Sequence, residues 1–262
     1  MLLDRRGRAA AAPVVCLALV VLAACGGESA TEPKTKQTKT TTSPGGGQPQ
    51  LPGSDSFEGR ALAESWGIVH RNLVQVAVQK GALTLTLKAP ALWFQGSEGV
   101  LAFKPVEGNF TATATVHTSK ESNRSQPPAP TIRLAGLMAR SPAGEAAHLQ
   151  NYVHIVVGNG PDGVLAIENK TTVNSNSVYE APAWPSADAQ LRICRVGQTF
   201  NLYKRPIGSG AWQLAASYER TDLPRTLDVG ADIYSPNTPP DLRATWDEVT
   251  YTPAASLADC ET

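Results

Sequence analysis

Apolar and polar residues alternate over most of the chain from Leu83 to Tyr251. A period of two with one apolar face is typical of antiparallel strands that pack on one side. The clearest runs are residues 83–87, 110–116, 191–194 and 227–233. No long apolar stretch of helical period follows the N-terminal segment. The sequence therefore predicts an all-β domain, either a sandwich or a barrel.

The most apolar part of this region is a pair of runs within residues 131–159. The first run contains Ile132, Leu134, Leu137 and Met138, and the second contains Val153, Ile155, Val156 and Val157. Between them, Pro142 fixes φ and Gly144 tolerates a positive φ, which is the chemistry of a turn. We expect these runs to form an antiparallel pair at the centre of a larger sheet.

The first 24 residues have the pattern of an export signal. Arginines at positions 5, 6 and 8 precede an apolar run that is too short to span a membrane comfortably. This run ends in Leu22-Ala-Ala-Cys25-Gly26, which resembles the lipobox of bacterial lipoproteins. The resemblance implies cleavage before Cys25 and acylation of that residue, which would attach the protein to a lipid bilayer. An ordinary secretory signal with a chance cysteine is the alternative.

In bacterial lipoproteins the cysteine carries a diacylglycerol on its thiol and a further acyl chain on its amino group, and the resemblance implies the same for Cys25. Three acyl chains anchor a protein far more firmly than one, so we expect a location in the bacterial cell envelope. In Gram-negative lipoproteins, an Asp directly after the cysteine favours retention in the inner membrane. This chain has Gly26 at that position, so the resemblance implies the outer membrane. Residues 25–52 carry no large apolar side chain before Leu51, which predicts a disordered tether. Residues 53–253 remain for the folded domain, and residues 254–262 for a C-terminal tail.

The formal net charge of the 262-residue chain is zero. Nucleic-acid binding relies on a surplus of Lys and Arg, so we expect no nucleic-acid partner.

Six short motifs follow one another in an order that resembles a known family. They are Asp55-Ser-Phe-Glu-Gly with Trp66, Gly108-Asn-Phe-Thr-Ala-Thr-Ala, Ala135-Gly-Leu-Met-Ala-Arg140, Asn151-Tyr-Val-His154, Leu191-Arg-Ile-Cys-Arg195 with the following Gly197–Tyr203 segment, and Ala244-Thr-Trp-Asp-Glu-Val249. Together they resemble the concanavalin A-like lectin/glucanase jelly rolls of the DUF1349 kind. The resemblance implies a jelly-roll β-sandwich and a carbohydrate-binding function. His154 departs from the family pattern, in which a Lys is usual.

Catalytic patterns are missing from the sequence. A jelly-roll glucanase needs two carboxylates across the scissile bond, set on one strand as E-x-D-x-x-E, and no such triplet occurs. The adjacent acids Asp247 and Glu248 point to opposite faces of a strand. No G-x-S-x-G elbow occurs, and the histidines lack the spacing of metal-ligand pairs. The sequence favours a protein that is not an enzyme, with a glycoside hydrolase as a less favoured alternative.

We expect no cofactor. A Ca²⁺ ion held by Asp55 and Asp247, at the predicted meeting of the first and last strands, is an alternative to two plain surface carboxylates.

Sugar binding needs an aromatic plate together with polar groups for hydroxyls. Trp93 and Trp184 lie in loop-like stretches and are the candidates for that plate, although core packing is the favoured interpretation of both. The remaining tryptophans, Trp66, Trp212 and Trp246, are expected in the core. His154 lies on the polar side of its strand, either as a ligand contact or as a solvated histidine. The sequence therefore favours a surface lipoprotein that binds a polysaccharide without cleaving it, and a structural or adhesive lipoprotein that binds a surface protein is the alternative.

Two cysteines remain once Cys16 is removed with the signal and Cys25 carries lipid. Exported proteins meet an oxidising compartment, in which disulfides persist. We predict a bridge between Cys194, which lies on a strand, and Cys260 in the tail, which would fold back along the sheet. Two free thiols are the alternative.

Overall fold

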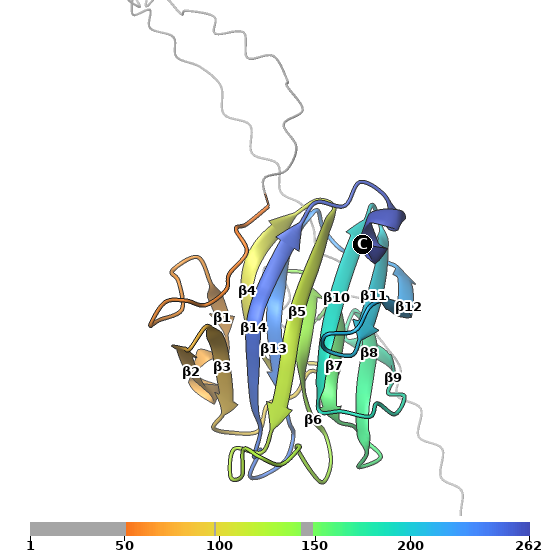
Figure 1. The fold of residues 1–262 in the computed structure, drawn as a ribbon. Helices are drawn as coiled ribbons and strands as arrows, with labels where there is room; N and C mark the ends of the chain where they lie inside the picture. Colours follow the sequence, from red (N-terminus) through yellow and green to blue (C-terminus); the bar gives the residue numbers. More distant parts are fainter. Residues whose placement is uncertain (1–50, 97, 143–148) are drawn as a thin grey trace, which may run out of the picture. The chain divides into compact units, whose positions relative to one another are not determined.

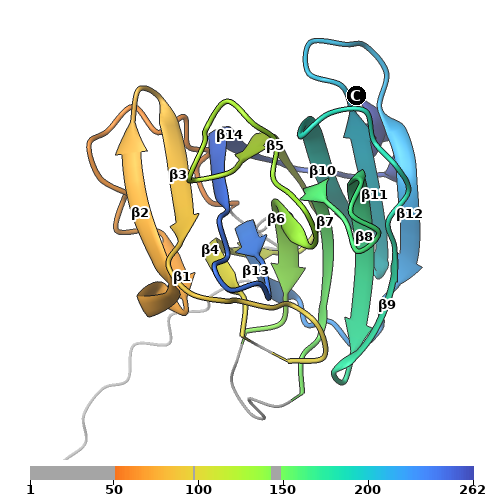
Figure 2. The same cartoon turned by 90° about the horizontal axis from the view of Figure 1, so that it is seen from below.

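Two antiparallel sheets lie face to face in the folded part of the chain (Figure 1, Figure 2). The computed structural model describes residues 51–96, 98–142 and 149–262. The predicted signal peptide, Cys25 and residues 26–50 of the predicted tether lie outside this part. Among the described residues, no helix is both long and apolar enough to cross a bilayer.

We call the two sheets I and II. In spatial order, sheet I consists of β1 (Gly67–Val69), β4 (Val100–Glu107), β13 (Thr226–Tyr234), β6 (Arg133–Arg140), β7 (Tyr152–Asn159), β8 (Leu165–Val173) and β9 (Asn176–Glu180). Sheet II consists of β12 (Gln213–Glu219), β11 (Thr199–Arg205), β10 (Asp188–Val196), β5 (Phe110–Ser119), β14 (Arg243–Thr252), β3 (Ala82–Leu87) and β2 (Val74–Gln79). Two short 3₁₀ helices, η1 (Arg71–Leu73) and η2 (Leu257–Glu261), precede β2 and follow β14.

The main core lies between the sheets and is built from alternate strand positions. Leu83 and Leu85 of β3 contribute from sheet II, and Val153 and Ile155 of β7 contribute from sheet I. Trp246 donates a 3.0 Å hydrogen bond from its indole Nε1 to the carbonyl of Gly136. Burial of both sheet faces against each other is the expected consequence of the period-two pattern. The predicted all-β sandwich is therefore confirmed, as are core positions for Trp66 and Trp246.

The predicted central pair is also confirmed. Strand β6 pairs with β7 in antiparallel register, with Leu137 opposite Ile155. Every residue of both strands is buried. Part of the connecting turn, including Gly144, lies outside the described residues.

The face of sheet I that points away from sheet II is covered. A second apolar cluster lies there, made of Trp93, Leu101, Leu134, Met138, Tyr152, Val156 and Tyr234. Trp93 belongs to the chain that connects β3 to β4. This connection is fixed to β13 by Ala91 and Ser235, whose backbones exchange two hydrogen bonds of 2.8 Å. The β3–β4 connection thus shields the second apolar cluster, in the middle of sheet I, from water.

The C-terminal tail lies against the outer face of sheet II. Cys194 of β10 is bonded to Cys260 of η2, and their Cα atoms are 5.6 Å apart. The guanidinium of Arg192 donates a 2.6 Å hydrogen bond to the carbonyl of Cys260. The predicted disulfide and the predicted return of the tail along the sheet are both confirmed.

Strand β12 departs from the expected pattern because it is an edge strand of sheet II. Leu214 is 56% exposed. Trp212 is only half-buried, so the prediction that it lies in the core is wrong. Its ring instead packs against two guanidinium groups, those of Arg192 and Arg205, each 4.1 Å from the ring centroid.

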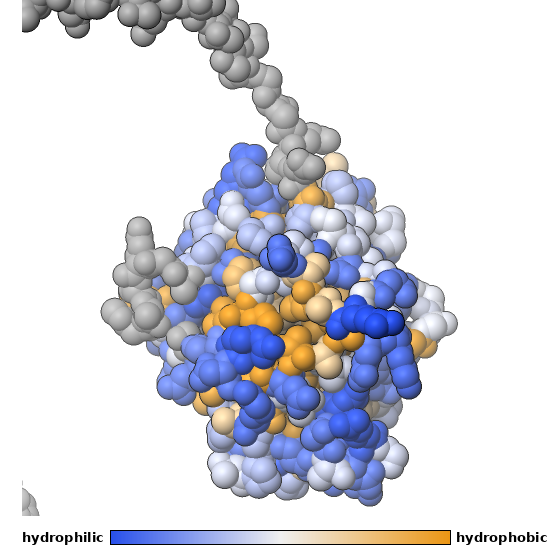
Figure 3. Space-filling model, turned by 90° about the vertical axis from the view of Figure 1, so that its left-hand side faces the viewer, coloured by the Kyte–Doolittle hydropathy of each residue, from blue (hydrophilic) through white to orange (hydrophobic). Residues whose placement is uncertain are grey.

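Apolar surface also gathers at the β1 and β2 side of the sandwich, which faces the viewer in Figure 3. Three partly buried side chains pack against the main core there, namely Ile68 of β1, Leu73 of η1 and Val76 of β2. The main core therefore reaches the surface at this end.

Candidate functional site

A cluster of ionisable side chains lies on the covered face of sheet I. The imidazole of His154 lies between two carboxylates, with Nε2 3.1 Å from Oε1 of Glu168 and Nδ1 3.1 Å from Oδ2 of Asp232. The ammonium of Lys170 lies 2.8 Å from the same Oε1 of Glu168. The hydroxyl of Tyr234 donates a 2.6 Å hydrogen bond to that oxygen. All of these side chains are buried. We call these residues the buried charge cluster.

Strand register brings the cluster together. Glu168 and Lys170 are two positions apart on β8, so their side chains share one face of the sheet. Lys170 stands directly opposite His154 on β7 and directly opposite Tyr179 on β9. Cross-strand neighbours on one face are close enough to interact. Asp232 and Tyr234 are likewise two positions apart on β13, so the cluster draws its side chains from β7, β8 and β13.

Electrostatics keep Glu168 ionised. Burial by itself would raise the pKa of its carboxyl, but the hydrogen bond from His154 and the charge of Lys170 outweigh burial and lower the pKa to about 2. Burial raises the pKa of Asp232, and the hydrogen bond from His154 opposes this rise. The pKa values of the two carboxyls therefore shift in opposite directions. Asp232 has no exposed surface and lies near the charge of Glu168, whereas Glu168 is bonded directly to the ammonium of Lys170.

A cavity of about 200 Å³ opens above the cluster. Its lining residues are Leu92, Phe94, Ile132, Pro161, Glu168, Lys170, Tyr179, Tyr234 and Pro236. Phe94 and Tyr179 are 37% and 42% exposed, and their rings meet edge to face with centroids 6.2 Å apart. The ammonium of Lys170 lies 5.6 Å from each ring centroid. Two accessible aromatic rings thus stand over a charged floor.

The two predicted aromatic plates lie elsewhere. Trp93 has no exposed surface: its Nε1 donates to the carbonyl of Val100 at 3.2 Å, and its ring packs against Tyr152. Trp184 is 9% exposed and donates from Nε1 to the carbonyl of Asp188 at 3.1 Å. Neither ring is therefore an exposed plate for a sugar, and core packing, the favoured interpretation of both, is confirmed. Each indole N–H is satisfied by a backbone carbonyl.

His154 does lie on the side of β7 that faces away from the main core. The prediction that this side is solvated is wrong, since the β3–β4 connection closes over it. His154 is fully buried and supports the floor of the cavity through Glu168.

The two predicted calcium ligands each have protein partners. Asp55 accepts hydrogen bonds from the Trp66 indole at 2.7 Å and from the backbone N–H of Phe57 at 2.9 Å. One carboxylate oxygen of Asp247 lies 3.2 Å from Nε2 of His117. Asp55 does meet the last strand, but through backbone bonds to Val249. No group of three or more metal-ligating side chains converges within the described ranges.

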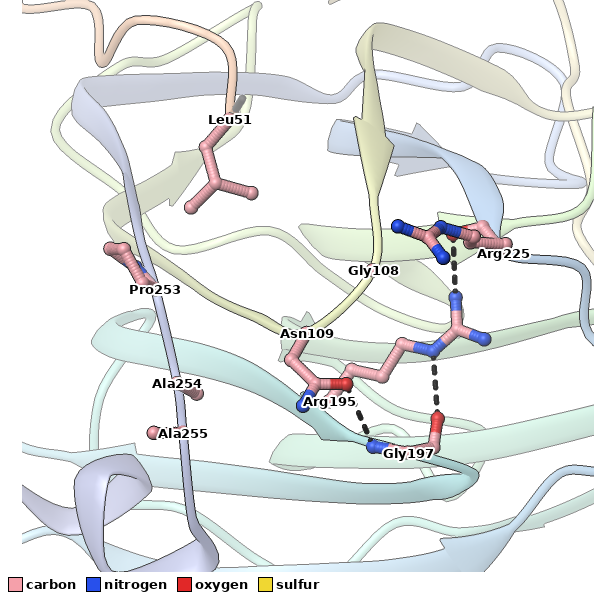
Figure 4. Close-up of a pocket in the computed structure, with 9 residues that line it drawn as sticks. All are labelled: Leu51, Gly108, Asn109, Arg195, Gly197, Arg225, Pro253, Ala254 and Ala255. Carbon is pink, nitrogen blue, oxygen red and sulfur yellow. Dashed lines mark hydrogen bonds between the residues drawn. The ribbon is translucent and has the colours of Figure 1, made fainter. Parts of the chain in front are cut away.

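A second cleft, of about 440 Å³, lies where Leu51 approaches the chain that follows β14 (Figure 4). Arg195 is its main polar side chain. Its guanidinium donates to the carbonyls of Gly197 at 3.0 Å, Pro224 at 2.8 Å and Arg225 at 3.1 Å. These bonds occupy the group in holding neighbouring turns together, so this cleft is a weaker candidate than the cavity over sheet I.

Sequence reasoning missed the residues that line the candidate site. One signal was present: Glu168 and Lys170 are opposite charges at a spacing of two, which on a strand predicts a pair on one face. The contribution of Phe94 had no local signal, because long-range folding of the β3–β4 connection places its ring beside Tyr179.

No family model matches the chain, and no curated protein matches it in sequence. Solved structures with a similar fold include a functionally unknown protein from Saccharomyces cerevisiae, with a TM-score of 0.57 and 16% identity over 73% of this chain and 98% of that chain. Another is the GH43 protein BlXynB from Bacillus licheniformis, with a TM-score of 0.58 and 14% identity over 77% of this chain and 39% of that chain. The match therefore spans well under half of the GH43 protein.

A plant lectin, I-B4 from Griffonia simplicifolia, is similar with a TM-score of 0.50 and 16% identity, over 76% of this chain and 98% of that chain. At these identities the likeness concerns the fold alone. It confirms the predicted jelly-roll β-sandwich, the architecture shared by lectins and by proteins of the glycoside-hydrolase group.

Proposed function

We propose that the protein binds carbohydrate, without cleaving it, in the cavity between Phe94 and Tyr179. The observation that carries this proposal is the pair of accessible aromatic rings above the buried, ionised Glu168. The electronegative face of an aromatic ring suits the C–H surface of a sugar ring, and a carboxylate accepts hydrogen bonds from the sugar hydroxyls. The lectin-like fold supports the proposal.

The hydrogen bonding of Glu168 indicates which oxygen serves a ligand. Its contacts with His154, Lys170 and Tyr234 all fall on Oε1. Since none of these contacts uses Oε2 and Glu168 lines the cavity, we propose Oε2 as the acceptor for a ligand hydroxyl. The buried charge cluster fixes the carboxylate in place, so little side-chain entropy is lost on binding.

The same geometry favours binding over hydrolysis. A glycosidase needs a protonated carboxylic acid within reach of the scissile bond. Glu168 is held ionised, and Asp232, whose pKa is raised, lies behind His154 with no exposed surface. A substrate in the cavity would meet a carboxylate and no acid partner.

Two ring-removing variants, Phe94→Ala and Tyr179→Ala, test the site. A glycan array with the full-length protein selects a ligand, and calorimetry measures its affinity. We expect each variant to weaken binding about twofold to tenfold, given an aromatic contribution of about 0.5–1.5 kcal/mol. Val178→Ala is the control, since Val178 is 68% exposed and adjacent to Tyr179 on the alternate face of β9. Affinity that is unchanged in both ring variants, or binding to a protein and to no glycan, would contradict the proposal.

We further propose that Cys25 is acylated and that the protein is anchored in the bacterial outer membrane. The support is the order of basic segment, apolar run and lipobox in the sequence. Mass spectrometry of the mature N-terminus should show a lipid-modified Cys25. In detergent phase partitioning, the wild-type protein should enter the detergent phase and the variant Cys25→Ser should remain in the aqueous phase. A mature N-terminus at another residue would refute the anchor.

A further inference from the structure

The walls of the cavity over sheet I are mostly apolar. Leu92, Ile132, Pro161 and Pro236 line it together with the two accessible rings. Ile132 and Leu92 are half-buried and pack against the second apolar cluster. A ligand in this cavity gains the most binding free energy when it places an apolar group against the walls, because apolar surface is then removed from water.

The floor offers an acceptor but few donors. The ammonium of Lys170 is already bonded to the carbonyl of Trp93 at 2.7 Å and to Glu168 at 2.8 Å, and it lies 3.5 Å from the hydroxyl of Tyr234. The hydroxyl of Tyr234 donates to Glu168. Among the lining side chains, the hydroxyl of Tyr179 is the remaining donor. A ligand oxygen or carbonyl placed deep in the cavity would therefore lack a donor, which is costly.

Resting on the proposed function, we infer that the cavity selects a 6-deoxy sugar. Such a sugar carries a methyl group where a common hexose carries a hydroxymethyl group. The methyl group would fill the apolar wall, and a ring hydroxyl would donate to Oε2 of Glu168. An N-acetyl sugar fits less well, because its amide carbonyl needs the donor that Lys170 has already committed. The preference follows from the apolar walls and from the committed donors.

Matched sugar pairs test this inference on the full-length protein in a neutral detergent. L-Fucose is compared with L-galactose, and L-rhamnose with L-mannose, because each pair differs only at carbon 6. We expect the deoxy member of one pair to bind about tenfold to a hundredfold more tightly. In saturation-transfer NMR, the methyl protons of that sugar should receive the strongest signal from the protein.

A wall variant gives an independent readout. Ile132→Thr keeps the β-branched shape but adds a hydroxyl to the wall, and should reduce the preference for the deoxy sugar while the hexose still binds. Val178→Thr is the matched control outside the cavity. Equal affinity within both pairs would overturn the inference and leave the proposed function standing. Absence of binding by every sugar, on the array as well, would overturn both.

Discussion

The ammonium nitrogen of Lys170 lies 2.8 Å from Oε1 of Glu168, with each side chain only 3% exposed. Two charges removed from water in this way are tolerated only when they neutralise each other and their remaining hydrogen-bonding groups are satisfied. Here His154, Tyr234 and the carbonyl of Trp93 supply the additional partners. The cavity over sheet I therefore has a floor whose geometry depends on the charges beneath it.

Removal of the Lys170 ammonium alone should lower the free energy of unfolding more than removal of both charges of the Lys170–Glu168 pair. In Lys170→Met, Glu168 loses the ammonium that lies 2.8 Å from its Oε1, and breaking a buried pair costs about 3–5 kcal/mol. The double variant Lys170→Met with Glu168→Gln should recover part of this loss. Urea unfolding of the two variants gives the comparison. A double variant that is no more stable than Lys170→Met would contradict a coupled pair.

Glu168 should also make stability depend on pH. Its pKa falls from an ordinary value of 4.5 to about 2 in the folded protein. A depressed carboxyl pKa stabilises the fold above the unfolded pKa, and this stabilisation is lost as pH falls toward the folded pKa. Between about pH 5 and pH 3, Glu168→Gln should therefore lose less stability than the wild-type protein. The pKa of Asp232 shifts upward in the same cluster, so its contribution has the opposite sign.

The measurement is the difference in unfolding free energy between the two pH values, for each protein. Glu248→Gln is a suitable control, since Glu248 is exposed on β14. If Glu168→Gln shows the same pH slope as the wild type, Glu168 is not held ionised by its neighbours.

The disulfide should stabilise the fold by restricting the unfolded chain. Cys194 and Cys260 are 66 positions apart, so the chain-entropy model gives about 4 kcal/mol as an upper figure. Cys260→Ser should lower the free energy of unfolding by up to that amount, and a reductant should have no further effect on the variant. Two reactive thiols in the denatured, unreduced wild-type domain would show that the bridge does not form.

The sequence predicted the sandwich well because period two is a local property of each strand. Leu137 and Ile155 could be assigned to a buried pair from their neighbours alone, and they face each other in β6 and β7. Cys194 and Cys260 could be paired because the other two cysteines belong to the N-terminal segment. These predictions needed only local patterns or elimination.

The candidate site could not be predicted in the same way. Alternation placed His154 away from the main core, and the fold agrees. Its burial depends on the covering β3–β4 connection: Trp93, 61 positions earlier in the chain, packs against Tyr152, whose ring lies 5.7 Å from the imidazole of His154. Backbone pairing of Ala91 with Ser235 helps to hold that connection on sheet I. A hydrophobic pattern predicts on which face of the sheet a side chain lies. It does not predict which segment covers the face that points away from the main core.

The same dependence on a covering segment gives the last prediction. A Cβ atom added at Gly99 would lie 2.2 Å from Cδ1 of Trp93, far closer than two carbon atoms approach without bonding. The indole cannot yield easily, because it is fully buried and donates to the carbonyl of Val100. Gly99→Ala should therefore displace Trp93 and open the β3–β4 connection, which also carries Phe94. We expect amide exchange around His154 to accelerate and glycan affinity to fall, while sheet II keeps its protection. Gly210→Ala is the matched control, since nothing lies within 4 Å of a Cβ added there. Unchanged exchange around His154 in Gly99→Ala would mean that Trp93 does not hold this cover in place.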